Sequence, residues 1–138
     1  MADKTVFTRI IDGELPCAKV YEDDQVFAFM SREAIRPGHA LVIPKDPVPD
    51  FFDLGDDVIV NIMRVAKQLA KAIESEFHPR RVGLVVAGFD VPHAHLHVIP
   101  MHEYHDITSK NILEDAIQET SMDELEANAA RLRKAFLA

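Results

Sequence analysis

Three of the seven histidines in this chain stand at alternate positions, in the run His93-Ala94-His95-Leu96-His97. In an extended strand, alternate side chains point to the same face, so the sequence predicts three imidazoles side by side. Imidazole is the side chain whose unperturbed pKa lies nearest neutrality, and it can act as nucleophile, proton carrier or metal ligand. This row of histidines limits the range of possible functions more than any other feature of the sequence does.

Covalent catalysis is the first chemistry that the row could support. A neutral imidazole nitrogen can attack phosphorus and form a phosphoramidate, which water later hydrolyses. The attacking ring needs one free nitrogen, with its other nitrogen held as N–H by a carbonyl group. The central His95 is the best placed for attack, and His97 could donate a hydrogen bond to the phosphate or to the leaving group.

A zinc site is the second alternative, because alternating histidines on a strand can bind Zn²⁺ and leave a position open for water. His39, His102 and His105 could add ligands, although no carboxylate or thiolate is marked by its spacing. His39 follows a Pro-Gly turn and could pair beside the triad strand, or it could be an ordinary strand-end histidine. We expect His102 and His105 at the surface. A half-exposed strand that carries three histidines by chance is the weakest interpretation.

The charge of the chain argues against a nucleic-acid partner. The 138 residues carry 15 Lys and Arg against 23 Asp and Glu, a formal charge of -8. Such a surface repels phosphate backbones, although it leaves room for a small nucleotide in a local pocket. Hydrophobic residues make up 48% of the chain, enough for the core of one domain.

Targeting and redox signals are absent from the sequence as given. The single Cys17 cannot form an intramolecular disulfide, and no Cys-x-x-Cys motif offers structural zinc ligands. The first residues lack the apolar segment of a signal peptide, and no stretch approaches the about 18 apolar residues of a membrane span. We therefore expect a cytoplasmic protein with no membrane partner.

The elements that must position the histidines form an α+β domain. Residues 56 to 77 are the clearest helix, because apolar residues recur at steps of three or four. A short helix is expected over 6–11, and the capping box Ser121-x-x-Glu124 begins a C-terminal helix. Strands are predicted over 19–21, 26–30, 39–43, 82–87 and 93–100. We expect one domain over 1–138, with a mostly antiparallel sheet of about five strands.

The histidine row and its surroundings resemble the histidine triad (HIT) family. The segment His93–Ile99 is similar to the family signature His-φ-His-φ-His-φ-φ, where φ is hydrophobic. Further similar blocks follow in family order: Phe7-x-x-Ile10-Ile11-x-Gly13-Glu14-Leu15-Pro16, Val20-Tyr21-Glu22-Asp23-Asp24, Ala28-Phe29 and Pro37-Gly38-His39-x-Leu41-Val42-Ile43-Pro44-Lys45. The resemblance covers residues from about 5 to 100 and leaves 101–138 as a C-terminal extension.

The resemblance implies an enzyme that acts on the α-phosphate of nucleotides. Family members are nucleotide phosphoramidases, dinucleoside polyphosphate hydrolases and nucleotidyl transferases, commonly homodimers that join their sheets into one of ten strands. His95 would become nucleotidylated, His97 would contact the phosphate, and His93 and His39 would support and orient them. A purine nucleotide or dinucleoside polyphosphate is the expected substrate, with no cofactor and no metal. The alternative is a nucleotide-binding regulatory module with little turnover.

The resemblance also implies a pocket for the base and the ribose. The positions that match its lining are Val6, Phe7, Ile10, Phe29 and Leu41. These apolar residues would equally suit core packing, and the two roles are compatible.

Two departures from the family concern the phosphate and the ribose. Ser31 stands where hydrolase members usually carry an Asp that can bind ribose hydroxyls. The loop before the triad, Ala87-Gly88-Phe89-Asp90-Val91-Pro92, is shorter than usual, and Asp90 stands where a hydroxyl donor to phosphate is expected. We still expect Gly88, Asp90 and Val91 beside the phosphate. A carboxylate there repels phosphate by about 1 kcal/mol or more, so either Asp90 turns away or the substrate differs.

Overall fold

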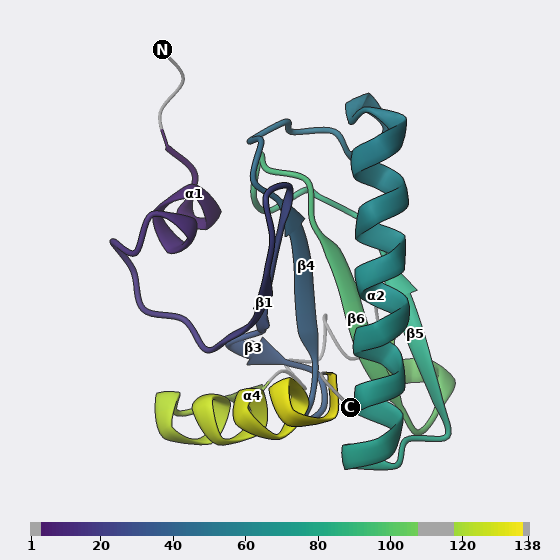
Figure 1. Ribbon diagram of the computed structural model, residues 1–138. Helices are drawn as coiled ribbons and strands as arrows, with labels where there is room; N and C mark the ends of the chain where they lie inside the picture. The colour runs from purple at the N-terminus through teal and green to yellow at the C-terminus, as the bar shows by residue number, and fades with distance from the viewer. Residues whose placement is uncertain (1–3, 108–117, 137–138) are drawn as a thin grey trace.

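Five antiparallel strands form the central sheet of this computed structural model, which describes residues 4–107 and 118–136. The strands are β1 (Lys19–Glu22), β2 (Val26–Met30), β4 (Ala40–Pro44), β5 (Arg81–Val85) and β6 (Leu96–Met101). Their order across the sheet is β1-β2-β4-β6-β5 (Figure 1). The predicted α+β architecture with about five antiparallel strands is confirmed.

Three helices surround the sheet: α1 (Val6–Ile11), α2 (Asp56–Phe77) and α4 (Met122–Phe136). The bounds of α1 and α2 are those predicted. The sequence did not predict the small antiparallel sheet of β3 (Glu33–Ala34) and β7 (Gln118–Glu119), nor the 3-10 helices η1 (Phe51–Asp53) and η2 (Tyr104–Asp106). In the part of the chain that the structure describes, no helix is long and apolar enough to cross a membrane.

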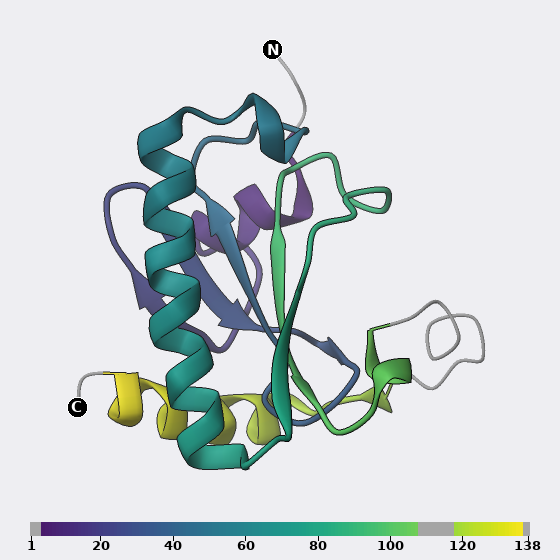
Figure 2. The same cartoon turned by 90° about the vertical axis from the view of Figure 1, so that its right-hand side faces the viewer.

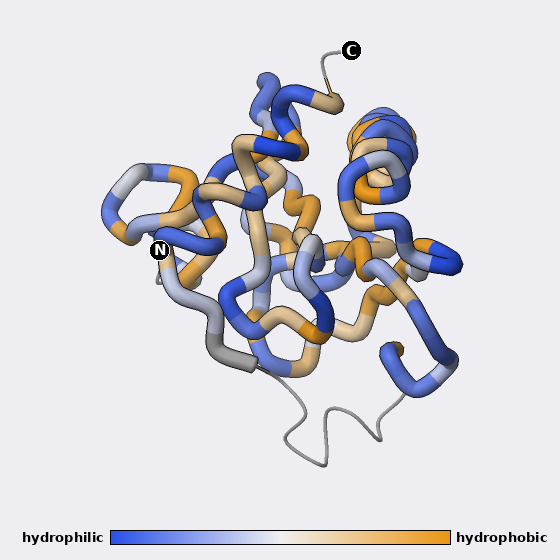
Figure 3. Tube along the Cα trace, turned by 90° about the horizontal axis from the view of Figure 1, so that it is seen from below, coloured by the Kyte–Doolittle hydropathy of each residue, from blue (hydrophilic) through white to orange (hydrophobic). Residues whose placement is uncertain are grey.

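Helix α2 covers one face of the sheet because one of its sides is apolar. Ile62, Leu69 and Ile73 are fully buried in the main core, together with Val42 and Val98 of the sheet. Figure 3 looks along the axis of α2 and shows that this helix carries both hydrophobic (orange) and hydrophilic (blue) residues. Burial of such side chains stabilises the fold by about 1.5 to 3 kcal/mol each.

Helix α4 packs into the same core at one end of the sheet, beside α2 and β1 (Figures 1 and 2). As the capping box predicted, the backbone N–H of Glu124 donates to the hydroxyl of Ser121 at 3.2 Å. Leu125, Ala129 and Leu132 form the buried side of the helix. The C-terminal segment that the structure describes therefore completes the core.

The opposite face of the sheet carries α1 and a second apolar cluster. The buried members of this cluster are Phe7, Ile10, Phe27, Phe29, Leu41 and Ile43. Phe7 and Ile10 come from α1, and the other four alternate along β2 and β4, as the period of a strand requires. This face is the one that meets the histidines.

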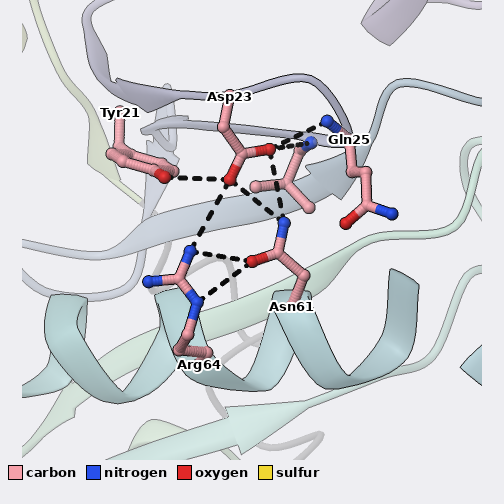
Figure 4. Close-up of polar contacts among 6 residues, drawn as sticks. Tyr21, Asp23, Gln25, Asn61 and Arg64 are labelled. Carbon is pink, nitrogen blue, oxygen red and sulfur yellow. Dashed lines mark hydrogen bonds and ion pairs between the residues drawn. The ribbon is translucent and has the colours of Figure 1, made fainter. Parts of the chain in front are cut away.

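The turn between β1 and β2 is tied to α2 through one carboxylate, Asp23 (Figure 4). Its contacts are the backbone N–H groups of Gln25 and Val26, the Tyr21 hydroxyl, the Asn61 amide and, at 3.7 Å, the Arg64 guanidinium. Partial burial opposes the charged form of Asp23, but these hydrogen bonds outweigh it and lower its pKa to about 2. Asp23 thus holds the hairpin against the helix.

Candidate active site

Four histidines from three segments lie close together, and α1 contacts two of them, His93 and His95, through Phe7. His39 precedes β4, His97 lies in β6, and His93 and His95 lie in the loop between β5 and β6. The ring centroids of His39 and His97 are 5.2 Å apart, and those of His95 and His97 are 5.1 Å apart. His97 thus lies between the rings of His39 and His95, whereas the sequence had left His39 open between a place beside the triad and an ordinary strand-end position.

The predicted strand over 93–100 is wrong at its beginning, because β6 begins only at Leu96. The backbone N–H of His93 donates to the carbonyl of Val91 at 2.8 Å, which closes a tight turn around Pro92. The N–H of Ala94 then donates to the carbonyl of Val48 at 2.8 Å instead of joining the β4 ladder. His93 and His95 are therefore positioned by a turn, and His97 is positioned by the sheet.

The orientation of His95 satisfies the requirement for a nucleophile. Its Nδ1 lies 2.8 Å from the carbonyl oxygen of His93, so this nitrogen carries the hydrogen and donates it. In the neutral ring the lone pair is then on Nε2. The side chain is buried, and its ring lies 5.0 Å from the edge-on ring of Phe7.

The hydrogen on His97 is set by a chain of two bonds that begins at a backbone amide. The N–H of Ile35 donates to Nδ1 of His39 at 3.1 Å, so the hydrogen of His39 is on Nε2. This Nε2 lies 3.0 Å from Nδ1 of His97 and donates to it. His97 must then carry its own hydrogen on Nε2, which makes that atom a donor.

Both rings of this pair stay neutral at pH 7. Burial lowers the pKa of His39 to about 3, and the neighbouring His97 adds to the effect. Burial and the nearby His95 lower the pKa of His97 to about 4, although the Asp90 carboxylate opposes this shift. The donor and acceptor roles in the chain therefore hold throughout the neutral pH range.

Close packing at Gly38 determines the position of His39. Gly38 has a φ of +98°, which side chains rarely allow, and an added Cβ would lie 3.0 Å from the ring of Phe77 and 3.2 Å from Pro100. Only glycine lets the chain turn here against α2 and β6, with His39 as the next residue.

His93 is held at both nitrogens and acts as a support. Its Nε2 donates to the carbonyl of Pro44 at 2.7 Å, and its Nδ1 accepts from the hydroxyl of Thr5 at 2.9 Å. Thr5 is also the N-cap of α1, where it accepts the N–H of Thr8 at 3.0 Å. The sequence interpretation missed Thr5, whose only signal was its position one residue before a predicted helix.

The apolar residues expected to line a nucleotide pocket fall into two groups. Phe7, Ile10, Phe29 and Leu41 are together in the second cluster, and Val91 packs against them. Val6 is 43% exposed and lies outside this cluster. Phe7 contacts both His93 and His95 edge-on, so the apolar surface continues directly into the histidines.

The residues that depart from the family pattern lie on two segments, Ser31 next to His39 and the other two in the loop before the triad. Ser31 is buried just after β2, and its N–H donates to the carbonyl of His39 at 3.0 Å. Gly88 turns the loop with a φ of +80°. Oδ1 of Asp90 lies 3.5 Å from Nε2 of His95 and accepts the N–H of Val91 at 3.1 Å. Asp90 therefore does not turn away from the site but faces His95.

The zinc alternative would have to break several of these hydrogen bonds. His93 and His39 use both ring nitrogens, and one nitrogen of His95 and of His97 is also engaged. Across residues 4–107 and 118–136, no group of three or more His, Cys, Asp or Glu is arranged to hold a metal ion. His102 and His105 are exposed, as expected, and lie beyond β6.

The HIT domain model matches residues 12–104, which include His39 and the whole triad. The chain belongs to the HIT family. The predicted family membership is thus confirmed, and the HIT domain match includes the loop with Asp90.

Named relatives and solved structures agree with this assignment. Protein hit of Bacillus subtilis is 36% identical over 108 residues, which cover 73% of each chain. Adenosine 5'-monophosphoramidase HNT1 of Saccharomyces cerevisiae is 33% identical over 134 residues, 96% of this chain and 80% of the yeast protein. The crystal structure of a Hit-like protein from Bartonella henselae superposes with a TM-score of 0.82 at 29% identity and covers 98% of both chains.

Proposed function

We propose that this HIT protein is a hydrolase or transferase of nucleotides that acts at the α-phosphate through a covalent nucleotidyl-His95 intermediate. The observation that carries the proposal is the orientation of His95, whose Nδ1–H is held by the carbonyl of His93. The lone pair is thereby left on Nε2, the atom that faces the exposed Asp90 carboxylate, and a nucleophile requires such a free nitrogen. The name of the yeast relative, an adenosine 5'-monophosphoramidase, supports the same class of reaction.

The proposed reaction has two displacements. The lone pair of His95 Nε2 attacks phosphorus while the bond from phosphorus to the leaving group breaks, and the leaving group departs with that electron pair and takes up a proton. Water then attacks phosphorus, the bond to Nε2 breaks, and His95 recovers its lone pair. The products are the leaving group and a nucleoside monophosphate, and the proton of the water passes to solvent.

His97 assists by donating a hydrogen bond from Nε2. Ile35 and His39 fix the hydrogen of His97 on this atom. A neutral donor aimed at a phosphoryl oxygen, or at the leaving atom, stabilises the charge that develops in the transition state. Because His97 is already oriented before substrate arrives, this stabilisation costs no rearrangement of the ring.

The apolar cluster beneath α1 would receive the base. Phe7, Ile10, Phe29 and Leu41 are only 3% to 8% exposed, so a base can reach them only if α1 moves from the sheet. A hydrogen bond from Thr5, the N-cap of this helix, to His93 links the helix to the histidines. Ser31 would offer a hydroxyl near the ribose, a weaker partner than a carboxylate.

A homodimer is part of the proposal. β5 is the last strand in the sheet order, and among the described residues its outer edge pairs with no strand. Leu84 and Val86 are about two-fifths exposed beside this edge. An unpaired apolar edge is a template for a second copy of the chain.

The acidic charge of the chain supports a small-molecule substrate over a nucleic acid. We also propose a cytoplasmic location.

A regulatory nucleotide-binding module with little turnover is the second candidate. The observation that favours it is Asp90, whose carboxylate lies 3.5 Å from the atom that must attack. A carboxylate in this position hinders the approach of an anionic phosphate.

Trapping the intermediate tests the proposal and separates the candidates. The wild type, His95→Ala and the surface control His102→Ala are incubated with adenosine 5'-phosphoramidate and with diadenosine polyphosphates. We expect an acid-labile nucleotidyl adduct and release of AMP with the wild type and the control, and neither with His95→Ala. Tight nucleotide binding without adduct or product would identify the regulatory module. Stoichiometric zinc, lost with His93→Ala or His97→Ala, would overturn the phosphoramidate mechanism.

A further inference from the structure

The carboxylate of Asp90 lies in the position that an anionic oxygen of a substrate would take. One of its oxygens, Oδ1, contacts both Nε2 of His95 at 3.5 Å and the backbone N–H of Val91 at 3.1 Å. A phosphoryl group under attack by His95 must approach the same Nε2. The protein therefore carries a negative charge of its own at the place where its proposed substrate brings another.

We propose that Asp90 is a specificity-determining residue, which disfavours substrates whose leaving group is anionic and favours those whose leaving group is an amine. This inference rests on the proposed function and names the substrate class of that site. Phosphoramidates of nucleosides would be preferred over anhydrides with phosphate or sulfate.

The preference follows from charge. A nucleoside phosphoramidate brings one negative charge on the phosphoryl group and a leaving nitrogen without further anionic groups. A dinucleoside polyphosphate or an adenylyl sulfate adds at least one more negative charge beside the same phosphorus. Like charges at contact distance repel each other, so each added charge near Asp90 weakens binding and raises the barrier.

Hydrogen bonding acts in the same direction. The leaving nitrogen of a phosphoramidate carries a hydrogen and can donate it to a carboxylate oxygen. The bridging oxygen of an anhydride has no hydrogen to donate. Asp90 can therefore form a favourable contact with one class of substrate and meets only acceptors in the other.

Because Asp90 is exposed, it lowers the turnover of substrates with an anionic leaving group but does not prevent it. Its side chain is 74% exposed, whereas that of His95 is 1% exposed. The loop has room on its outer side, since an added Cβ at Gly88 would meet nothing within 4 Å and Phe89 is 99% exposed. Bound substrate can thus displace the carboxylate toward solvent. Because water and salt screen an exposed charge, the selectivity should weaken as ionic strength rises.

Turnover of two substrates measures this selectivity. We compare kcat/KM for adenosine 5'-phosphoramidate and for diadenosine tetraphosphate in the wild type, Asp90→Asn and Asp90→Ser. The neutral variants should lower the preference for the phosphoramidate by about tenfold, as expected for one partly screened charge at contact distance. Sodium chloride at high concentration should reduce the preference of the wild type and leave that of Asp90→Asn unchanged. Equal preferences in all three proteins would overturn the proposal.

Asp123→Asn is the matched control for the loss of one negative charge. Asp123 is exposed in the first turn of α4, at the other end of the molecule. This variant has the same net charge as Asp90→Asn and should keep the substrate preference of the wild type. A similar change in both variants would show that net charge, and not Asp90, sets the selectivity.

Equilibrium binding tests the inference without turnover. Calorimetry with AMP and with adenosine is carried out on the wild type, Asp90→Asn and Asp123→Asn. We expect Asp90→Asn to bind AMP about tenfold more tightly and to bind adenosine as the wild type does. An unchanged affinity for AMP contradicts the role of Asp90 even if the enzyme turns over. A gain in AMP affinity without any adduct on His95 would support the role of Asp90 and contradict the proposed catalysis.

Discussion

Asp23 and Asp90 are two aspartates on connections between strands, and their surroundings could hardly differ more. Asp23 accepts hydrogen bonds from a hydroxyl, an amide and two backbone N–H groups, and its side chain is 25% exposed. Asp90 accepts one N–H from the adjacent residue and otherwise faces His95. A carboxylate whose hydrogen-bonding capacity is used within the protein stabilises the fold. A carboxylate that is exposed beside a buried histidine remains available to act on a ligand.

The largest effect should come from His95, the proposed nucleophile beside Asp90. His95→Ala should lower kcat by at least about a thousandfold, because it removes the atom that forms the covalent bond. The free energy of unfolding, measured in urea, should change far less than activity does. A variant that keeps substantial turnover would show that this region is not the catalytic one.

As the pH falls, the stability contributed by the histidines should be lost at a higher pH than the stability contributed by Asp23. His39 and His97 have a pKa of about 3 and about 4 in the folded protein against about 6.5 when unfolded. The unfolded state therefore binds more protons between these values, and stability that is full above pH 6.5 is lost as the pH falls. We expect the free energy of unfolding to drop by about 2 to 4 kcal/mol from pH 7 to pH 5.

Two controls locate the origin of this loss. In His97→Gln the dependence on pH between 7 and 5 should be shallower, since one buried imidazole is gone. Asp23, with a pKa lowered to about 2 from its usual 3.8, should contribute only as the pH falls from about 4 to 2. A wild type equally stable at pH 7 and pH 5 would contradict the neutral state of the His39–His97 pair.

Asp23→Ala should have the opposite profile to His95→Ala. It leaves two backbone N–H groups and the Asn61 amide without their acceptor, which should cost about 2 to 3 kcal/mol of stability. The kcat of the folded enzyme should be unchanged, because the hairpin turn contacts none of the four histidines directly. Asp24→Ala, the exposed neighbour, is the control and should leave both quantities as they are.

Thr5→Val should give the smallest effect, and it should change both stability and substrate binding. The change removes the N-cap of α1 and the donor to His93, at a cost of about 1 kcal/mol. Since α1 carries Phe7 and Ile10, KM should rise more than kcat falls. Thr5→Ser keeps the hydroxyl and should restore both. Identical kinetics in Thr5→Val would show that α1 does not depend on this bond.

The elements whose apolar residues recur with a strong period could be predicted from the sequence. α2 and α1 were found with their true bounds because apolar residues mark one side of each and turn residues follow. The capping box located α4 for the same local reason. The predicted beginning of β6 was wrong. The hydrogen bond from Ala94 to the carbonyl of Val48, which keeps this segment out of the sheet, forms between segments that are distant in the sequence.

The candidate site shows the same division between local and distant causes. The histidines could be named because they follow a spaced motif. The apolar residues named from the resemblance stay predictions for the pocket, although Phe7, Ile10, Phe29 and Leu41 lie in one cluster. Thr5 was missed, because only the three-dimensional position of α1 brings its hydroxyl to His93. The role of the partly exposed Val6 in the pocket stays a prediction. The sequence could mark Asp90 as unusual, but its direction toward His95 is a property of the folded loop.

The hydrogen bonds within the site also give each imidazole its own spectroscopic identity. His39, His93 and His97 hold their hydrogen on Nε2, whereas His95 holds it on Nδ1. Nitrogen-15 chemical shifts differ between these two tautomers, so His95 has a resonance pattern unlike that of its three neighbours. The state of one atom, Nε2 of His95, can therefore be followed in the intact protein, free and with ligand, in a sample whose histidines are labelled with nitrogen-15.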